Sequence, residues 1–203
     1  MIEDGNVRPS TRKTLAVTNF PPLKNPKDVQ SFLGLTSYFR KFVPQYSLLA
    51  HPLSKLLKKD AKFEFGEEQQ LAFRQLEFAL ASDPVLKLYR TGAETELHTD
   101  ASSVGLGAIL LQKDDIDQHF YPIYYASWKT TEAESRYTSY ELEVLAIIKA
   151  INKFRVYLLG IRLKIVIDCR AFALTKICVC KLRDGRYCCR SSIVRSNIVR
   201  AII

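Results

Sequence analysis

The spacing of hydrophobic residues changes near residue 90 and divides the chain into two parts. Before that point, apolar side chains recur at three- and four-residue steps, which is the spacing of amphipathic helices. We predict a helix that starts at Pro26 behind Asn25 as N-cap. A second helix is predicted over residues 46–57, with a bend or a delayed start at Pro52. A third covers residues 66–81, with core candidates Leu71, Phe73, Leu76 and Leu80.

Beyond residue 90 the pattern is typical of strands. Residues 96–100, 107–111 and 121–125 are short apolar or alternating runs. The polar run at 114–117 predicts a turn between the last two strands, and we expect its aspartates to be solvated. These segments predict a sheet in the second part of the chain.

The strongest helix prediction covers Thr138 to Leu159, followed by Gly160 as a suitable C-terminal stop. Residues 163–167 then form a continuous apolar run, typical of a strand inside a sheet. Three strands, a helix and a fourth strand parallel to one of them predict an α/β sandwich, preceded by the small helical unit. The core candidates of the long helix are Val144, Ile147, Ile148, Ile151, Phe154 and Leu158.

The composition is that of a folded protein with a basic surplus. A hydrophobic fraction of 47% and a charged fraction of 25% suit a globular chain, and 203 residues leave room for one ordinary domain and a small one. The net charge of +9 favours a polyanionic partner, nucleic acid before membrane. Most of this charge lies in residues 176–203, which hold seven Lys or Arg against one Asp.

The chain carries no recognisable membrane or secretory segment. No apolar run is long enough to cross a bilayer, and the N-terminus lacks the basic and apolar regions of a secretory signal. All five cysteines follow Asp168, so the preceding residues fold without a disulfide, as suits a reducing compartment. We therefore expect an intracellular protein that does not contact a membrane.

Three carboxylates stand where buried sequence rarely places charge. Asp100 and Asp168 end apolar strand-like runs, and Glu143 lies near the start of the long helix. If the fold brings them together, they form an acidic cluster, which is costly to bury unless a divalent metal neutralises it. Metal-assisted attack on a phosphodiester is the chemistry that such a cluster favours.

Structural roles compete with this hypothesis. A strand-end residue such as Asp100 is often a turn former, and the glycines that follow it could mark a β-bulge. His98, two residues earlier on the same strand face, is interpreted as a solvent-facing imidazole. Residues 138–141 match a capping box, which gives Glu141 a structural role. Glu143, about 200° away around the helix, is thereby left as the functional candidate.

The segments that contain these three carboxylates resemble segments of the RNase H domain of reverse transcriptases from gypsy-type long-terminal-repeat retrotransposons. The matching segments are Asp100-Ala101-Ser102, the helix of Glu143, and Ile165-Val166-Ile167-Asp168. The resemblance is collinear over roughly residues 5–175. Upstream, segments similar to the thumb and connection region of the same polyprotein occur at 29–35, 38–44, 52–57 and 72–76.

The resemblance implies a five-stranded mixed sheet with flanking helices, and hydrolysis of the RNA strand in an RNA–DNA hybrid. It also implies that Asp100, Glu143 and Asp168 bind two Mg²⁺ ions roughly 3.5–4 Å apart. Asp100 would bridge both ions, and Glu143 would help orient the ribose 2′-hydroxyl. The implied partners are the hybrid and the polymerase portion of the parent polyprotein. The polymerase palm has no counterpart here, so we expect no DNA synthesis by this chain alone.

The resemblance divides the chain into a thumb/connection-like helical segment at 1–90, an incomplete RNase H-like domain at 91–175, and a basic, Cys-rich tail at 176–203. The family implies a further helix, a last strand and a fourth metal-binding aspartate, whereas the tail offers only Asp184 in a turn-like setting. We interpret the tail as the product of a lost reading frame. A zinc-binding tail and a basic nucleic-acid arm are the alternatives.

Two other functions stay open at this point. One is a non-catalytic module that binds a hybrid or a partner subunit through its basic and aromatic surface. Its candidate residues are Tyr38, Arg40, Lys41 and Tyr46. Aromatic residues at helical spacing are more often core, which weighs against this alternative. The other is an inactive product of a decayed element.

Overall fold

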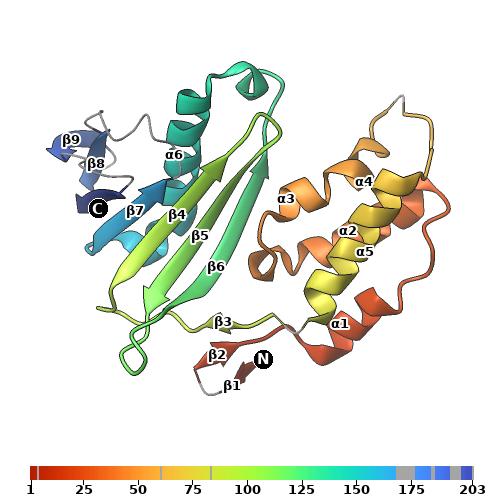
Figure 1. Cartoon of the computed structure of the whole chain (residues 1–203), viewed down its shortest axis with the longest axis horizontal. Helices are drawn as coiled ribbons and strands as arrows, with labels where there is room; N and C mark the ends of the chain where they lie inside the picture. The colour runs from red at the N-terminus through yellow and green to blue at the C-terminus, as the bar shows by residue number, and fades with distance from the viewer. Residues whose placement is uncertain are drawn as a thin grey trace.

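A central sheet and a separate group of helices make up the molecule (Figure 1). The computed structural model describes residues 1–3, 5–59, 61–82, 84–167, 177–183, 186–192 and 198–202, the last three segments as backbone. The helices α1 to α5 lie together beside the strand β6, and α6 lies against the sheet. The predicted combination of an α/β sheet with a preceding helical unit is confirmed.

The helical unit is built from short helices around an aromatic core. Its members are α1 (Thr11–Thr18), α2 (Pro26–Ser37), the 3₁₀ turn η1 (Arg40–Phe42), α3 (Tyr46–Leu49), α4 (His51–Lys55) and α5 (Glu67–Ala81). The Asn25 side chain accepts a 3.0 Å hydrogen bond from the Asp28 amide, so the predicted N-cap of α2 is confirmed. The helix predicted over 46–57 is divided into α3 and α4, with Pro52 in the first turn of α4.

The first strands of the chain form a small sheet that the sequence did not predict. The strands β1 (Ile2–Glu3), β2 (Asn6–Val7) and β3 (Leu86–Lys87) are two residues long and antiparallel, in the order β1-β2-β3. This sheet joins the N-terminus to the segment between the helical unit and the central sheet. A two-residue strand is too short to show an alternating period, which explains why it was missed.

The central sheet has the strand order β10-β7-β4-β5-β6. Its strands are β4 (Thr95–Ala101), β5 (Gly105–Lys113), β6 (Phe120–Lys129), β7 (Arg162–Ile167) and β10 (Ile198–Ile202). The strands β4 and β7 are parallel, and the other neighbours are antiparallel, so the sheet is mixed as expected. Since a parallel pair needs a crossover, α6 makes the connection from β6 to β7.

One face of the sheet packs against α6 (Ser139–Leu158). Leu97 of β4, Leu110 of β5 and Ile165 of β7 are fully buried against this helix together with Phe154. Gly160, with φ +78°, follows the helix in the left-handed conformation of a C-terminal stop. The prediction that Ile148 lies in the core is wrong, because this residue is 48% exposed on the outer side of α6.

The helical unit packs against the opposite face at β5 and β6. Tyr125 of β6 packs into the core of the helices, and its sheet partner Ile109 points to the same side. The core of the unit includes Phe32, Phe39, Leu53, Leu76 and Leu80. The prediction that Leu71 lies in the core is wrong, because this residue is 58% exposed. The strand β5 therefore lies between α6 on one face of the sheet and the helical unit on the other.

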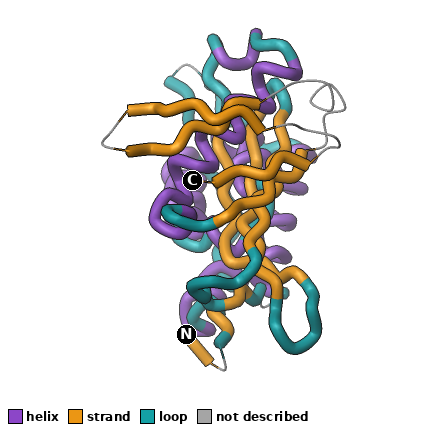
Figure 2. Tube along the Cα trace, turned by 90° about the vertical axis from the view of Figure 1, so that its left-hand side faces the viewer, coloured by secondary structure: helices purple, strands orange, loops and turns teal. Residues whose placement is uncertain are grey.

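The described residues of the tail lie in strands. The strands β8 (Ile177–Arg183) and β9 (Arg186–Ser192) form an antiparallel hairpin, which extends to one side of the sheet (Figure 2). The strand β10 pairs antiparallel with β7 and supplies the fifth strand of the central sheet. No helix within the part of the chain that the structure describes is long and apolar enough to cross a membrane.

Candidate functional site

Asp100 lies near the end of β4, on the sheet face that meets the helical unit. Its strand partner is Gly107 of β5, and its side chain is exposed. Gln45 Nε2 donates a 2.9 Å hydrogen bond to Asp100 Oδ2 from the start of α3. Gln45 is one of two non-glycine residues with a positive φ in the described part of the chain, at +48°. The Asp100 carboxylate is therefore held by a residue from the helical unit.

A hollow of about 160 Å³ lies beside this contact. It is bounded by the Pro44–Gln45 segment on one side and by β4 and β5 on the other. Gly107 has no side chain, which leaves space next to the carboxylate of Asp100. The residues that line it are Pro44, Gln45, His98, Thr99, Asp100, Gly107, Ala108 and Ile109.

Glu143 is a buried carboxylate on α6, with only 5% of its surface exposed. Its helix neighbours Leu142 and Ala146 pack with Leu106 of β5. The capping box is present: Glu141 Oε2 accepts from the Thr138 amide at 2.8 Å, and the Thr138 hydroxyl accepts from the Glu141 amide at 3.3 Å. The structural role predicted for Glu141 is therefore confirmed, and Glu143 takes no part in the cap.

Two of the three proposed carboxylates lie in described segments, and the third does not. The helix of Glu143 packs against β4, the strand of Asp100. Thr99, which precedes Asp100, pairs with Ile167 of the parallel strand β7. Asp168 lies outside the described residues. Within those residues, no three His, Cys, Asp or Glu side chains are grouped to hold a metal, so the three-carboxylate site stays a prediction.

A charged cluster that the sequence did not reveal lies on the same strand face as Asp100. Glu96 is 5% exposed and receives a 2.6 Å hydrogen bond from Lys164 of β7. His98 Nε2 lies 2.8 Å from the other Glu96 oxygen. Burial alone would raise the pKa of Glu96, but the hydrogen bonds from Lys164 and His98 outweigh it and hold that pKa below its ordinary value. His98 is thus bound to Glu96 instead of simply facing solvent.

Two of the four candidate residues for nucleic-acid binding, Tyr46 and Arg40, have structural roles. Tyr46 is 6% exposed, and its hydroxyl lies 2.9 Å from the Thr36 hydroxyl. Burial raises the pKa of Tyr46, while the Thr36 hydrogen bond and Arg40 lower it to a smaller extent. Arg40 donates to the backbone oxygen of Ser127 on β6. Tyr46 is therefore a core residue, and Arg40 ties the helical unit to the sheet.

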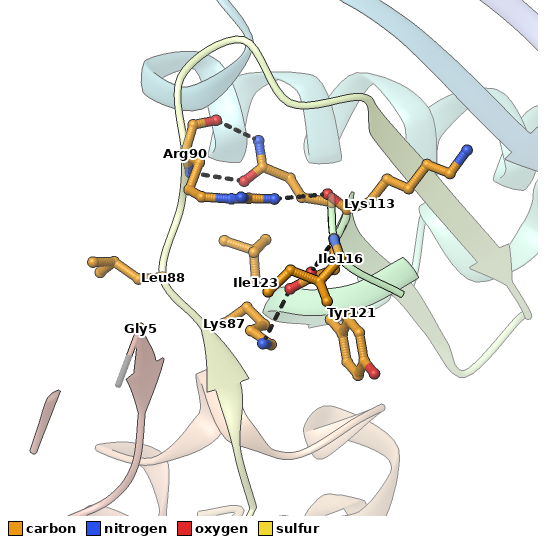
Figure 3. A pocket seen from close by; sticks show the side chains of 10 residues that line it. Gly5, Lys87, Leu88, Arg90, Lys113, Ile116, Tyr121 and Ile123 are labelled. Carbon is orange, nitrogen blue, oxygen red and sulfur yellow. Dashed lines mark hydrogen bonds and ion pairs between the residues drawn. The ribbon is translucent and has the colours of Figure 1, made fainter. Parts of the chain in front are cut away.

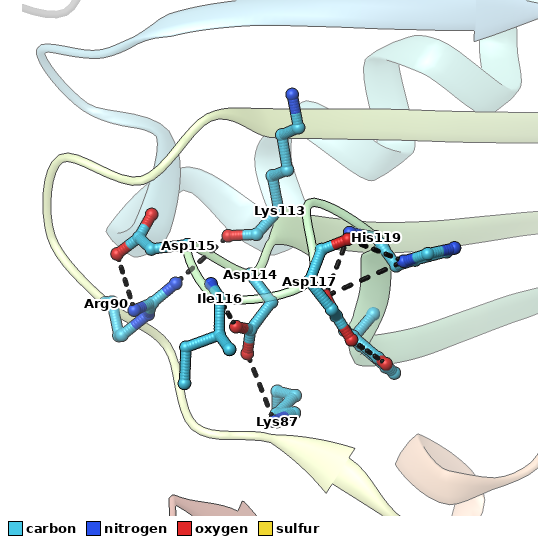
Figure 4. A network of polar contacts seen from close by, with 9 residues as sticks. Lys87, Arg90, Lys113, Asp114, Asp115, Ile116, Asp117 and His119 are labelled. Carbon is cyan, nitrogen blue, oxygen red and sulfur yellow. Dashed lines mark hydrogen bonds and ion pairs between the residues drawn. The ribbon is translucent and has the colours of Figure 1, made fainter.

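A second hollow, of about 270 Å³, lies where β3 meets the β5–β6 hairpin (Figure 3). Three basic side chains border it, and Figure 4 shows two of them in ion pairs with the hairpin: Lys87 with Asp114 at 3.2 Å and Arg90 with Asp115 at 2.8 Å. The third, Lys113, lies 3.6 Å from Glu94. Each of these three cations therefore has an acidic partner. The ion pairs of Lys87 and Arg90 connect the segment around β3 to the β5–β6 hairpin.

The acidic turn at 114–117 has more bonding partners than predicted from the sequence. Asp114 accepts hydrogen bonds from the Ile116 amide at 2.9 Å and from Lys87, which together lower its pKa. Asp117 accepts a 2.5 Å hydrogen bond from the Tyr121 hydroxyl, and this contact is the main reason that the pKa of Asp117 is lowered and that of Tyr121 raised. The turn was predicted at the right place, but these two aspartates are bonded rather than merely solvated.

Residues 65–166, about half of the chain, match the family model of the RNase H-like domain found in reverse transcriptase. The match runs from the start of α5 into β7 and so includes both Asp100 and Glu143. The boundary expected at residues 90 and 91 falls inside the matched segment, and its position stays a prediction.

Curated relatives include the Transposon Tf2-3 and Tf2-4 polyproteins of Schizosaccharomyces pombe (strain 972 / ATCC 24843). Each is 42% identical over 135 residues, which is 66% of this chain and 10% of the polyprotein. The chain thus spans about a tenth of the length of these relatives.

Solved structures with a similar fold include two of the foamy viral protease-reverse transcriptase. The one in complex with double-stranded DNA has a TM-score of 0.66 and 22% identity, over 79% of this chain and 28% of that chain. The one in complex with RNA/DNA hybrid has a TM-score of 0.64 and 23% identity, over 79% of this chain and 22% of that chain. At these identities the likeness supports the fold.

Proposed function

This chain belongs to the family of RNase H-like domains found in reverse transcriptase, and from that premise we propose that it hydrolyses the RNA strand of an RNA–DNA hybrid. It is similar to a segment of retroelement polyproteins that spans about a tenth of their length. Asp100, Glu143 and Asp168 are the proposed catalytic and metal-binding residues. The polymerase portion of the polyprotein and the hybrid are its proposed partners.

One arrangement supports the proposal: the strand of Asp100, the strand that precedes Asp168 in the sequence and the helix of Glu143 are neighbours. The strands β4 and β7 are parallel and in register up to Thr99 and Ile167, and each of these residues directly precedes a proposed ligand in the sequence. The helix of Glu143 packs across the same strands. These elements are adjacent, which supports a shared role, although Asp100 lies on the sheet face that meets the helical unit and α6 packs on the other face.

The donor set fits magnesium. All three side chains are carboxylates, the hard oxygen ligands that Mg²⁺ prefers. The chemistry that bound Mg²⁺ supplies is activation of a water molecule and neutralisation of charge on the attacked phosphodiester. Asp100 would hold the metal from β4, and Asp168 from the position that follows β7 in the sequence. Glu143 would hold it from the helix and accept a hydrogen bond from the ribose 2′-hydroxyl, which is the group that distinguishes RNA from DNA.

Cleavage of a labelled RNA–DNA hybrid by the full chain in Mg²⁺ tests this function. We expect cleavage of the RNA strand only, and its loss when EDTA removes the metal. Glu143→Gln should lower the rate by about 10²–10³-fold, the usual effect of removing one charge-stabilising group from an active site. Glu141→Gln is the matched control because glutamine also completes a capping box, and its rate should stay within about twofold of the parent.

The alternatives give different results in the same assay. Hybrid binding without cleavage by the parent chain would support a non-catalytic binding module. Neither binding nor cleavage would support an inactive product of a decayed element. Equal losses in Glu143→Gln and Glu141→Gln would show that the start of α6 matters only for folding, and would remove Glu143 from the proposed site.

A further inference from the structure

The contact between Gln45 and Asp100 joins the helical unit to the proposed metal site. Residue 45 is 55 positions upstream of Asp100 and lies outside the segment that matches the family model. Its side-chain amide donates to Oδ2 of Asp100 at 2.9 Å. We propose that Gln45 is a positioning residue, which fixes the orientation of the Asp100 carboxylate for a divalent cation. This inference rests on the proposed function.

The chemistry of the contact suits a cation site. A carboxylate has about four acceptor positions, so one N–H bond fixes the Asp100 side chain and leaves most of its lone pairs available. The amide of Gln45 is neutral, so it restrains the carboxylate without cancelling its charge. A lysine or arginine would hold Asp100 more strongly but would repel a divalent ion.

The backbone of Gln45 provides a second, independent observation. Its φ of +48° lies in the left-handed region, which is unfavourable for a side chain of this kind and persists only where the surroundings impose it. Those surroundings are contacts to the sheet: the Ser47 amide donates to the Ser127 hydroxyl at 2.9 Å, and Arg40 donates to the Ser127 backbone oxygen. Docking of the helical unit therefore sets the position from which Gln45 reaches Asp100.

The hollow beside Asp100 supplies the space that the inference needs. This hollow of about 160 Å³ opens to solvent between the Pro44–Gln45 segment and the strands, with Gly107 opposite Asp100. Hydrogen-bond partners of metal-binding carboxylates commonly control ligand orientation, and their loss costs about 10–100-fold in metal affinity. We expect the same range here.

Binding of Mn²⁺ to the full chain, followed by electron paramagnetic resonance, measures the effect without relying on turnover. Gln45→Met keeps the length of the side chain and removes the donor, so the dissociation constant for Mn²⁺ should rise about 10–100-fold. Gln45→Gly also removes the donor and accepts the positive φ without strain, which keeps the test valid if the methionine variant folds poorly. Gln118→Met is the matched control: Gln118 also has a positive φ, of +60°, and its side-chain amide donates to the Asp115 backbone oxygen at 2.9 Å, so the same change is made away from Asp100. Its Mn²⁺ affinity should change by less than about threefold.

Hybrid cleavage gives a second readout. If Gln45 acts on the cation site, Gln45→Met should raise the Mg²⁺ concentration for half-maximal rate and leave the rate at saturating Mg²⁺ nearly unchanged. Unchanged Mn²⁺ affinity in both Gln45 variants, with Asp100→Asn abolishing binding, would overturn the inference and leave the proposed function intact. A parent chain whose Mn²⁺ binding is not reduced by Asp100→Asn would overturn both.

Discussion

Lys164 Nζ on β7 lies 2.6 Å from Glu96 Oε1 on β4, and the two residues are direct partners in the parallel register. His98 contacts the second oxygen of Glu96 at 2.8 Å. The Glu96 side chain is only 7% exposed, whereas its partners Lys164 and His98 are 31% and 39% exposed, so only the carboxylate end of each contact is shielded from water. A buried carboxylate thus links β4, which contains Asp100, to β7, which precedes Asp168 in the sequence.

The first prediction is an acid-sensitive contribution of Glu96 to stability. Burial would raise its pKa, but Lys164 and His98 hold that pKa below its ordinary value of 4.5. As the pH falls below about 4.5, the unfolded chain therefore takes up the proton before the folded protein does. The stabilisation is fully present above that pH, decreases as the pH falls, and is lost once the pH passes below the pKa of the folded state.

Glu96→Gln measures this contribution. At pH 7 the variant should unfold with a free energy lower by about 2 kcal/mol, the typical contribution of a hydrogen bond to a charged group. Urea unfolding from pH 7 to pH 3 should show the difference shrink as the pH falls. A difference that stayed constant over this range would show that the charge of Glu96 does not stabilise the fold.

Much of the fold was predictable because local signals agreed with tertiary packing. The helix α6 combined a sustained apolar period, the capping box at Thr138 and a stop at Gly160. The period alone could not decide which apolar residues face the core, since Ile148 recurs with the others and yet lies on the outer side. Which apolar stripe is buried depends on the width of the sheet that the helix covers.

The candidate site was only partly accessible to sequence reasoning. The roles of Glu141 and Glu143 could be separated from the capping-box pattern and the helical angle. The contact of Gln45 with Asp100 could not be predicted, because no local pattern connects a helix start to a strand 55 residues away. For the same reason the pairing of Glu96 with Lys164, 68 positions apart, became visible only with the strand register.

The second prediction concerns the close approach of the helical unit to β5. A Cβ atom at Gly105 would lie 2.9 Å from Leu48 Cδ2 and 3.1 Å from the Trp128 backbone oxygen. Because the backbone atom cannot move as easily as the leucine, Gly105→Ala should destabilise the protein by about 1–3 kcal/mol, the cost of overpacking. Thermal and urea unfolding give the measurement.

Gly34→Ala is the matched control for that substitution. Gly34 lies within α2, and a Cβ there would meet no atom within 4 Å. Alanine should therefore stabilise the protein by about 0.5–1 kcal/mol through helix propensity. If Gly105→Ala were equally stabilising, the contact between Leu48 and β5 would not be as close as the structure indicates.

The third prediction tests the start of α6. Thr138→Ala removes the side-chain acceptor for the Glu141 amide and should cost about 1 kcal/mol of stability. Thr138→Ser keeps the hydroxyl and should stay close to the parent. Hydrogen exchange of the amides in the first turn of α6 should accelerate in the alanine variant alone. Equal exchange in the two variants would mean that the cap does not hold this end of the helix.

The last prediction separates a core aromatic residue from a surface one. Tyr46 is buried with its hydroxyl 2.9 Å from that of Thr36, whereas Tyr38 is 67% exposed with Lys13 Nζ 4.0 Å from its ring centre. Tyr46→Phe should lower the free energy of unfolding by about 0.5–1.5 kcal/mol, because a buried hydrogen bond is lost, and should leave the affinity for RNA–DNA hybrid unchanged. Tyr38→Ala should alter stability by less than about 0.5 kcal/mol, as expected for an exposed position. A loss of hybrid affinity in Tyr46→Phe without a loss of stability would contradict the core role and restore Tyr46 as a nucleic-acid contact.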